Sequence, residues 1–132
     1  MTTHIFLAED DEEDKDLFLL IISEISINYL ISDARDGMKF MTMLENATEL
    51  PDFIFLDLNM PLKNGIECLQ EIKMSAKWGH IKTVILSTSS HPEQKKELYE
   101  MGADLCLQKP NSFSTFKNML SRCLQMDWAT LK

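Results

Sequence analysis

The fold of this chain is decided by the stretch Phe53-Ile54-Phe55-Leu56-Asp57, which is followed at once by Leu58-Asn59-Met60-Pro61. Four consecutive apolar residues are typical of a strand buried on both faces, as in a parallel sheet that helices cover on each side. The run ends in a carboxylate, Asp57. Because open α/β sheets bind their ligands beyond the carboxyl ends of the strands, we expect Asp57 to lie at the functional edge of such a sheet.

Apolar runs of strand length occur at five places, and each is followed by a stretch with helical spacing. The runs lie near residues 4–8, 29–34, 52–57, 82–87 and 104–107. Strict alternation of strands and helices predicts parallel strands, right-handed crossovers and helices on both faces. We therefore predict an α/β, flavodoxin-like (βα)5 fold, a doubly wound parallel five-stranded sheet in the strand order 2-1-3-4-5.

Capping residues predict where the helices begin. The acids at 12–14 suit the first turn of the first helix, where the helix dipole favours anions, and the second helix should begin after Asp36. Capping boxes are suggested by Asn64-Gly65-Ile66-Glu67 and Ser90-His91-Pro92-Glu93, which should start the third and fourth helices. Ser112 should cap the fifth helix. Helical spacing predicts the residues that the first helix uses around its turns: Leu17, Leu20, Ile21, Glu24 and Ile25.

A length of 132 residues, 45% of them hydrophobic, fits a single domain over residues 1–132, with a core from about 4 to 126 and a short tail. A net charge of −8 opposes binding to nucleic acid or to an anionic membrane. Three cysteines without a CxxC spacing indicate neither a disulfide framework nor a zinc site, and no signal peptide is recognisable. We expect a cytoplasmic protein whose thiols are buried and reduced.

Three other expected strands also end in polar residues. Glu9 and Asp10 follow the first strand, Ser87 closes the fourth, and Lys109 follows the fifth. Since the carboxyl ends of parallel strands share one edge, these side chains should meet Asp57 there. Carboxylates, a hydroxyl and an ammonium in one place form a set suited to phosphoryl transfer, with Asp57 as the acceptor.

The crowded carboxylates of Glu9, Asp10 and Asp57 would repel one another, and a hard divalent cation with oxygen ligands relieves such repulsion. We expect Mg²⁺ that keeps several waters, with the main-chain carbonyl of Asn59 as a further ligand. Lys109 can pair with Asp57 before the reaction and with a phosphoryl oxygen after it.

Over essentially its whole length, the chain resembles the receiver domain of two-component response regulators. The resemblance is carried by the acidic pair after the first strand, the acceptor with its sequel, the hydroxyl after the fourth strand and the lysine-proline pair after the fifth: Glu9, Asp10, Asp57, Asn59, Met60, Pro61, Gly65, Ser87, Lys109 and Pro110. It implies that Asp10, Asp57 and the Asn59 carbonyl bind Mg²⁺, with Glu9 acting through water.

By the same resemblance, Asp57 receives its phosphoryl group from a sensor histidine kinase or a histidine phosphotransfer protein, Ser87 senses the group, and Lys109 ion-pairs with it. The family consists of signalling switches rather than enzymes, and slow self-dephosphorylation is implied. We expect a stand-alone receiver that changes which downstream protein it binds. The resemblance places the binding surface on the fourth helix, fifth strand and fifth helix, where the basic side chains are Lys95, Lys96, Lys117 and Arg122.

Two departures from the family pattern bear on the mechanism. Glu9 stands where many relatives have aspartate, a variant that should keep metal binding intact. The family often places an aromatic residue before the lysine of the fifth strand, and here that position is Cys106. Because a thiol cannot sweep the volume of a ring, the aromatic-switch part of the usual mechanism should be altered.

An aspartyl-phosphate phosphatase of the haloacid-dehalogenase type is the alternative from another class. In that class the nucleophile follows the first strand and an acid lies two residues later, whereas here the acidic pair comes first and Asn59 lies two residues after Asp57. A degenerate receiver that acts as a constitutive interaction module is a further alternative, which the intact Asp10, Asp57 and Lys109 argue against.

Overall fold

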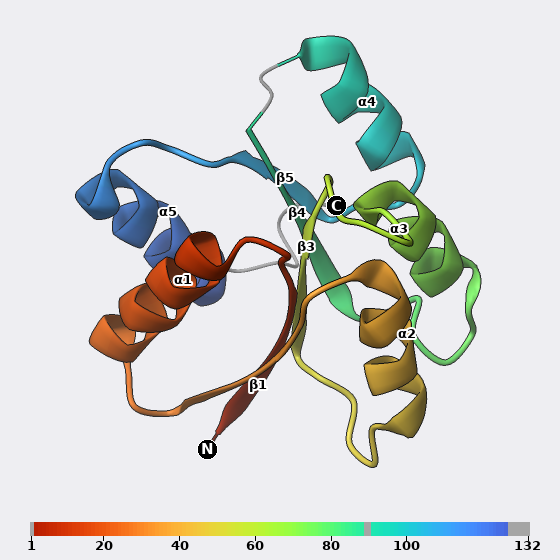
Figure 1. Ribbon diagram of the computed structural model, residues 1–132, viewed down its shortest axis with the longest axis horizontal. Coiled ribbons are helices and arrows are strands. Elements are labelled where there is room, and N and C mark those ends of the chain that lie inside the picture. The colour runs from red at the N-terminus through yellow and green to blue at the C-terminus, as the bar shows by residue number, and fades with distance from the viewer. Residues whose placement is uncertain (1, 89–90, 127–132) are drawn as a thin grey trace.

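The computed structural model describes residues 2–88 and 91–126, and strands and helices alternate along them (Figure 1). The strands are β1 (Thr3–Ala8), β2 (Tyr29–Ala34), β3 (Phe53–Asp57), β4 (Lys82–Ser87) and β5 (Leu105–Gln108). The helices are α1 (Glu12–Ile25), α2 (Gly37–Asn46), α3 (Gly65–Met74), α4 (Pro92–Glu100) and α5 (Phe113–Gln125).

All neighbouring strands pair in parallel, in the order β2-β1-β3-β4-β5. This order confirms the predicted flavodoxin-like (βα)5 fold. Each strand begins and ends within one residue of the apolar run that predicted it. The apolar runs locate the strands well because both faces of a parallel sheet are buried.

The central strand β3 supplies both halves of the core. Ile54 and Leu56 pack with residues of α2, α3 and α4 on one face of the sheet. Phe53 and Phe55 pack with residues of α1 and α5 on the other. Figure 1 shows α1 and α5 together on one side of the strands and α2 and α3 on the opposite side. Asp57, the last residue of β3, is thereby held at the end of the most buried strand.

Three helices begin after the caps that the sequence predicts, and α1 begins at the acids expected in its first turn, after Asp11. The side chains of Asp11, Asp36, Asn64 and Ser112 accept hydrogen bonds from backbone N–H groups in the first turns of α1, α2, α3 and α5. At α3 the capping box is complete, since the Glu67 side chain also accepts the Asn64 N–H at 3.0 Å. These caps fix the helix ends that face the functional edge of the sheet.

The predicted start of α4 is wrong by one residue. The helix begins at Pro92 with His91 as its N-cap residue, whose side chain does not cap the helix. Ser90, the expected cap, lies outside the described residues. Proline is favoured at the first helical position because its fixed φ suits the helix and it lacks an N–H that would need a partner.

Not all of the residues predicted around the turns of α1 are buried. Ile21 is fully buried, but Leu20 is 51% exposed, and Phe18 and Ile22 are buried instead. Phe18 packs edge-on against Phe55 of β3, with ring centroids 5.2 Å apart. The position of this ring on the sheet, rather than the apolar spacing alone, sets how α1 is rotated.

Cys68, Cys106 and Cys123 are buried, as predicted. Burial raises the pKa of the Cys106 thiol to about 11, so this side chain stays protonated near neutral pH. Within the described part of the chain, no helix has both the length and the apolar character needed to cross a membrane.

Candidate functional site

Three acids gather where β1 and β3 end. The pairing of Ala8 with Leu56 places Glu9 beside Asp57, because each is the next residue along its strand. One carboxylate oxygen from each of Glu9, Asp10 and Asp57 lies within 4.8 Å of the others. Glu9 and Asp57 are buried, at 3% and 6% exposure, whereas Asp10 is exposed. The cluster is therefore an acidic pocket with one side open to solvent.

Burial is the main reason why the carboxyl groups of Glu9 and Asp57 have raised pKa values. It raises the pKa of Glu9 to about 7, against the lowering effect of the Lys109 hydrogen bond, and the nearby Asp57 raises it further. Burial also raises the pKa of Asp57, while hydrogen bonds from Glu9 and the Asn59 backbone lower it. Burial thus favours a single proton held between the two carboxyl groups over two charged carboxylates.

The cluster fits a divalent cation. Oxygen ligands from three acids within 4.8 Å of one another leave a span that one Mg²⁺ ion and its waters can fill. The exposed Asn59 and Asp10 line one open hollow of about 560 Å³ beyond the end of β3. Hence solvent can reach the acids from this side.

Lys109 follows β5 and reaches across the edge of the sheet to the acids. Its Nζ donates hydrogen bonds to Glu9 Oε1 at 2.6 Å and to Asp14 Oδ2 at 3.1 Å, and lies 3.6 Å from Asp57 Oδ1. Burial alone would lower the pKa of this lysine, but the Glu9 hydrogen bond and the Asp57 charge outweigh burial and raise it. The ammonium therefore remains charged and is shared among three acids.

Asp14 is the site residue that the sequence analysis missed. It was read only as an acid in the first turn of α1, yet its side chain contacts Lys109. A usable signal existed in its position, because α1 follows β1 directly and its first turn must lie beside the functional edge. Asp14 is 43% exposed, so its contribution to the charge of the site is screened by solvent.

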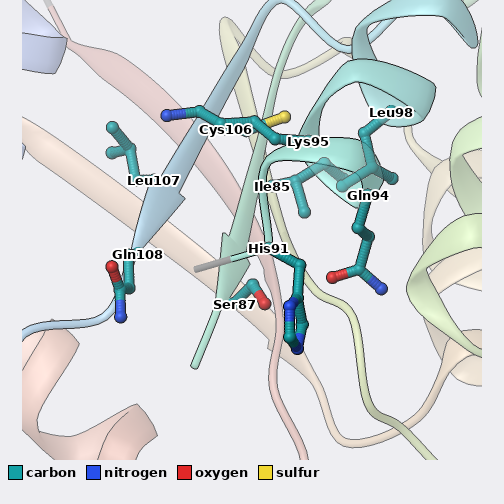
Figure 2. Close-up of a pocket in the computed structure, with 9 residues that line it drawn as sticks. All are labelled: Ile85, Ser87, His91, Gln94, Lys95, Leu98, Cys106, Leu107 and Gln108. Atoms are coloured by element: carbon teal, nitrogen blue, oxygen red, sulfur yellow. The ribbon is translucent and has the colours of Figure 1, made fainter. Parts of the chain in front are cut away.

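Ser87 is buried at the end of β4, and β4 pairs with β3 up to Asp57 and Leu86. Figure 2 shows its hydroxyl at a cavity that Cys106 also lines. The two positions expected to form the switch therefore border the same space. Residues of α4 line this cavity as well, so Ser87 lies between the end of β3 and α4.

A glycine lets the loop after β3 pack closely against Asp57. The Gly65 N–H donates to the Leu58 carbonyl at 3.0 Å. A Cβ at Gly65 would lie 2.4 Å from the carbonyl oxygen of Asp57, so no larger residue fits without shifting the backbone. Gly65 thus allows α3 to begin directly against the end of the strand that bears Asp57.

Comparison with known proteins agrees with this geometry. The chain matches the family described as response regulator receiver domain over residues 5–121. It is 31% identical over 121 residues to response regulator Rcp1 of Synechocystis sp., covering 88% of this chain and 82% of Rcp1.

Solved structures give the same result. The phosphorylated cyanobacterial phytochrome response regulator RcpA has a TM-score of 0.86 and 28% identity, covering 100% of this chain and 97% of that one. The Mn²⁺-bound form of Rcp1 has a TM-score of 0.82 and 29% identity, covering 90% of this chain and 89% of that one.

The fold and the acidic strand-end pocket define a receiver-type signalling protein. This chain belongs to the response regulator receiver family of two-component systems. The family match decides against the haloacid-dehalogenase alternative. In that class the nucleophile follows the first strand, whereas here Asp57 follows β3.

Proposed function

We propose that this receiver accepts a phosphoryl group on Asp57 from the phosphohistidine of a sensor kinase or phosphotransfer protein, in a Mg²⁺-dependent reaction, and thereby changes which protein it binds. The observation that carries the proposal is the buried carboxylate of Asp57 within 4.8 Å of two further acids and 3.6 Å from the Lys109 ammonium. An acceptor, a metal-binding set and a counter-charge are the parts that phosphoryl transfer to a carboxylate requires.

In the proposed step, a carboxylate oxygen of Asp57 forms the new P–O bond while the P–N bond of phosphohistidine breaks and the leaving imidazole keeps the electron pair. Asp10, Asp57 and the Asn59 carbonyl, with Glu9 through water, would hold Mg²⁺, which supplies positive charge to the phosphoryl oxygens. Lys109 adds an ammonium that can exchange its contact with Asp57 for one with a phosphoryl oxygen.

Ser87 supplies the proposed coupling to the rest of the protein. Its hydroxyl lies at the end of β4, next to the acceptor strand, and can donate a hydrogen bond to a phosphoryl oxygen on Asp57. Movement of Ser87 would reach α4, because both line the same cavity. The surface that we expect to change is therefore that of α4 and β5, continued by α5.

The acceptor assignment can be tested with phosphoramidate, a small donor whose P–N bond resembles that of phosphohistidine. The protein is incubated with phosphoramidate and Mg²⁺, and the phosphorylated residue is mapped by mass spectrometry. We expect one adduct, on Asp57, that is absent without Mg²⁺ and in Asp57→Asn. The matched control is Asp11→Asn, which removes a nearby acid that caps α1 and should leave the labelling intact. An unchanged adduct in Asp57→Asn would refute the proposal.

A further inference from the structure

Lys109 is held from three different elements at the edge of the sheet. Its Nζ donates to Glu9 after β1 at 2.6 Å and to Asp14 of α1 at 3.1 Å, and it lies 3.6 Å from Asp57 of β3. Its backbone N–H donates to the Ser87 carbonyl at 2.7 Å, so the base of the side chain is fixed as well. An ammonium group has three N–H donors, and Glu9 and Asp14 use two of them. The third donor can therefore serve Asp57, or a group bonded to it, without breaking either bond.

The position of Asp14 is set by the first turn of α1. Its backbone N–H donates to the capping carboxylate of Asp11 at 3.0 Å. The Asp11 N–H in turn donates to Oε2 of Glu9 at 3.4 Å, while Oε1 of the same carboxylate accepts from Lys109. The four residues thus close a ring of hydrogen bonds that joins the ends of β1 and β5 to the start of α1. Because the ring fixes where the Asp14 carboxylate lies, it also fixes where that carboxylate holds the lysine.

The other charges in the first turn of α1 do not share this role. Glu12 pairs with Lys15 at 3.1 Å and with Arg35 at 3.5 Å, so both of these cations are engaged by another acid. Glu13 is exposed to solvent. Asp14 is therefore the acid of this turn that reaches the lysine at the end of β5.

Asp14 differs from the other two partners of Lys109 in its relation to the metal-binding set. Glu9 and Asp57 belong to the cluster of carboxylates within 4.8 Å of one another that fits a divalent cation, and Asp14 does not. A bound cation and its waters compete for the oxygens of those two carboxylates. Asp14 is consequently the partner that can keep its bond to the lysine while the metal is bound.

We propose that Asp14 is a positioning residue for phosphoryl transfer, which holds the ammonium of Lys109 beside Asp57 while the metal engages the other acids. The inference rests on the proposed function and deepens it, because the lysine acts on the reaction only if Asp57 accepts a phosphoryl group. The long lysine stem loses rotational freedom when its charge is fixed at the reacting group. The bond to Asp14 removes part of this cost before the reaction begins.

The rate of phosphorylation measures this role. Each variant is incubated with phosphoramidate and with enough Mg²⁺ to saturate it, and the adduct on Asp57 is followed by mass spectrometry. Asp14→Ala should be labelled about three- to fivefold more slowly, the effect of losing one partly exposed ion pair. Asp14→Glu keeps the charge and should recover most of the lost rate. The matched control is Glu13→Ala, which removes one charge from the same helix turn and should keep the wild-type rate.

A second measurement observes the lysine itself, without metal or phosphoryl donor. In protein with isotope-labelled lysine, NMR follows the exchange of the Lys109 ammonium protons with water, and the signal is assigned by its loss in Lys109→Arg. Exchange should accelerate about threefold or more in Asp14→Ala, because one of the two hydrogen bonds of the ammonium is gone. It should stay unchanged in Glu13→Ala, so a general effect of charge at the helix start would be detected.

The outcomes separate this inference from the proposed function. Equal labelling rates in wild type and Asp14→Ala, or unchanged exchange of the ammonium protons, overturn the inference and leave the proposed function standing. Faster labelling of Asp14→Ala would mean that Asp14 draws the ammonium away from Asp57, which also overturns it. Equal slowing in Glu13→Ala would assign the effect to the charge of the helix start and not to the contact with the lysine. Wild-type protein that takes no label contradicts the proposed function, and the inference falls with it.

Discussion

Lys109 donates its shortest hydrogen bond, of 2.6 Å, to Glu9 rather than to Asp57, the proposed acceptor, from which its nitrogen lies 3.6 Å. The bond joins the end of β5 to the end of β1, although β3 and β4 lie between these strands in the sheet. One ammonium at the end of β5 therefore pairs with an acid at the end of the third strand away. In the metal-free, unphosphorylated protein, Lys109 stabilises the acidic pocket as a whole, because its ammonium is shared among Glu9, Asp14 and Asp57.

Loss of this lysine should destabilise the fold at neutral pH. Lys109→Met leaves the buried carboxyl groups of Glu9 and Asp57 without their counter-charge, and removing one partner of a buried ion pair typically costs about 3 to 5 kcal/mol. Urea denaturation near pH 7.5 measures the loss. The matched control is Lys117→Met, which breaks an exposed pair with Glu24 and should cost at most about 1 kcal/mol. Equal losses in the two variants would contradict the role given to Lys109.

The stability of the metal-free protein should fall as the pH rises from about 4.5 to about 7. The pKa of Glu9 is raised by burial from 4.5 to about 7, so between these values the folded protein binds a proton that the unfolded chain has released. The stability that this proton provides is fully present below the unfolded pKa of 4.5 and is lost as the pH rises through the folded pKa of about 7. Thermal melting at several pH values, without Mg²⁺, measures this trend, which Glu9→Gln should remove.

Mg²⁺ should reverse that loss, because the cation relieves the repulsion of the deprotonated acids only in the folded state. At about 100 times its dissociation constant it should add about 2.7 kcal/mol to the free energy of unfolding. The rise in melting temperature should be large near pH 7.5, small near pH 5, and absent in Asp10→Ala. Asp16→Ala, an exposed acid of α1 outside the cluster, serves as the control. A full Mg²⁺ effect in Asp10→Ala would show that the cation binds elsewhere.

The sequence predicts the fold closely because its strands are apolar runs and its helix starts are polar caps, both local features. It also predicts that Asp57, Glu9 and Lys109 meet, because strand ends of a parallel sheet share one edge. It places the first turn of α1 near this edge but does not predict that Lys109 contacts Asp14, since this contact depends on how α1 packs in the folded protein. The exposure of Leu20 was missed for a related reason: the rotation of α1 is set by ring packing on the sheet.

A second ion pair, partly buried and also invisible in the sequence pattern, should contribute to stability. Lys73 Nζ donates to Asp104 Oδ2 at 3.0 Å and to the carbonyls of Gly79 and Ile81. Asp104 Oδ2 also accepts the Thr83 N–H at 2.8 Å, so the pair ties α3 to the starts of β4 and β5. Lys73→Met should lower the free energy of unfolding by about 1 to 3 kcal/mol, the cost of leaving such polar partners unpaired.

Urea denaturation provides the measurement, with Lys77→Met as a control at an exposed position. The double variant Lys73→Met/Asp104→Asn should be less destabilised than the sum of the single variants, because each partner alone is left buried without its counter-charge. Strict additivity would show that the two side chains do not act as a pair. Phosphorylation of Asp57 should persist in the folded fraction, since this pair lies at the opposite edge of the sheet.

Ser87 should transmit the state of Asp57 to α4 without the help of an aromatic side chain on β5. Cys106 is too small to follow a movement of Ser87 by filling and leaving the cavity between them, so the backbone after β4 and the helix above the cavity should carry the change. Comparison of amide chemical shifts with and without beryllofluoride, in the presence of Mg²⁺, measures how far the change extends. We expect shifts along α4 and at Cys106, whose N–H bonds to Tyr99 of that helix.

Those shifts should shrink markedly in Ser87→Ala and return in Ser87→Thr, which restores the hydroxyl. A full response in Ser87→Ala would show that Ser87 is a passive end of the strand and that another residue couples Asp57 to α4.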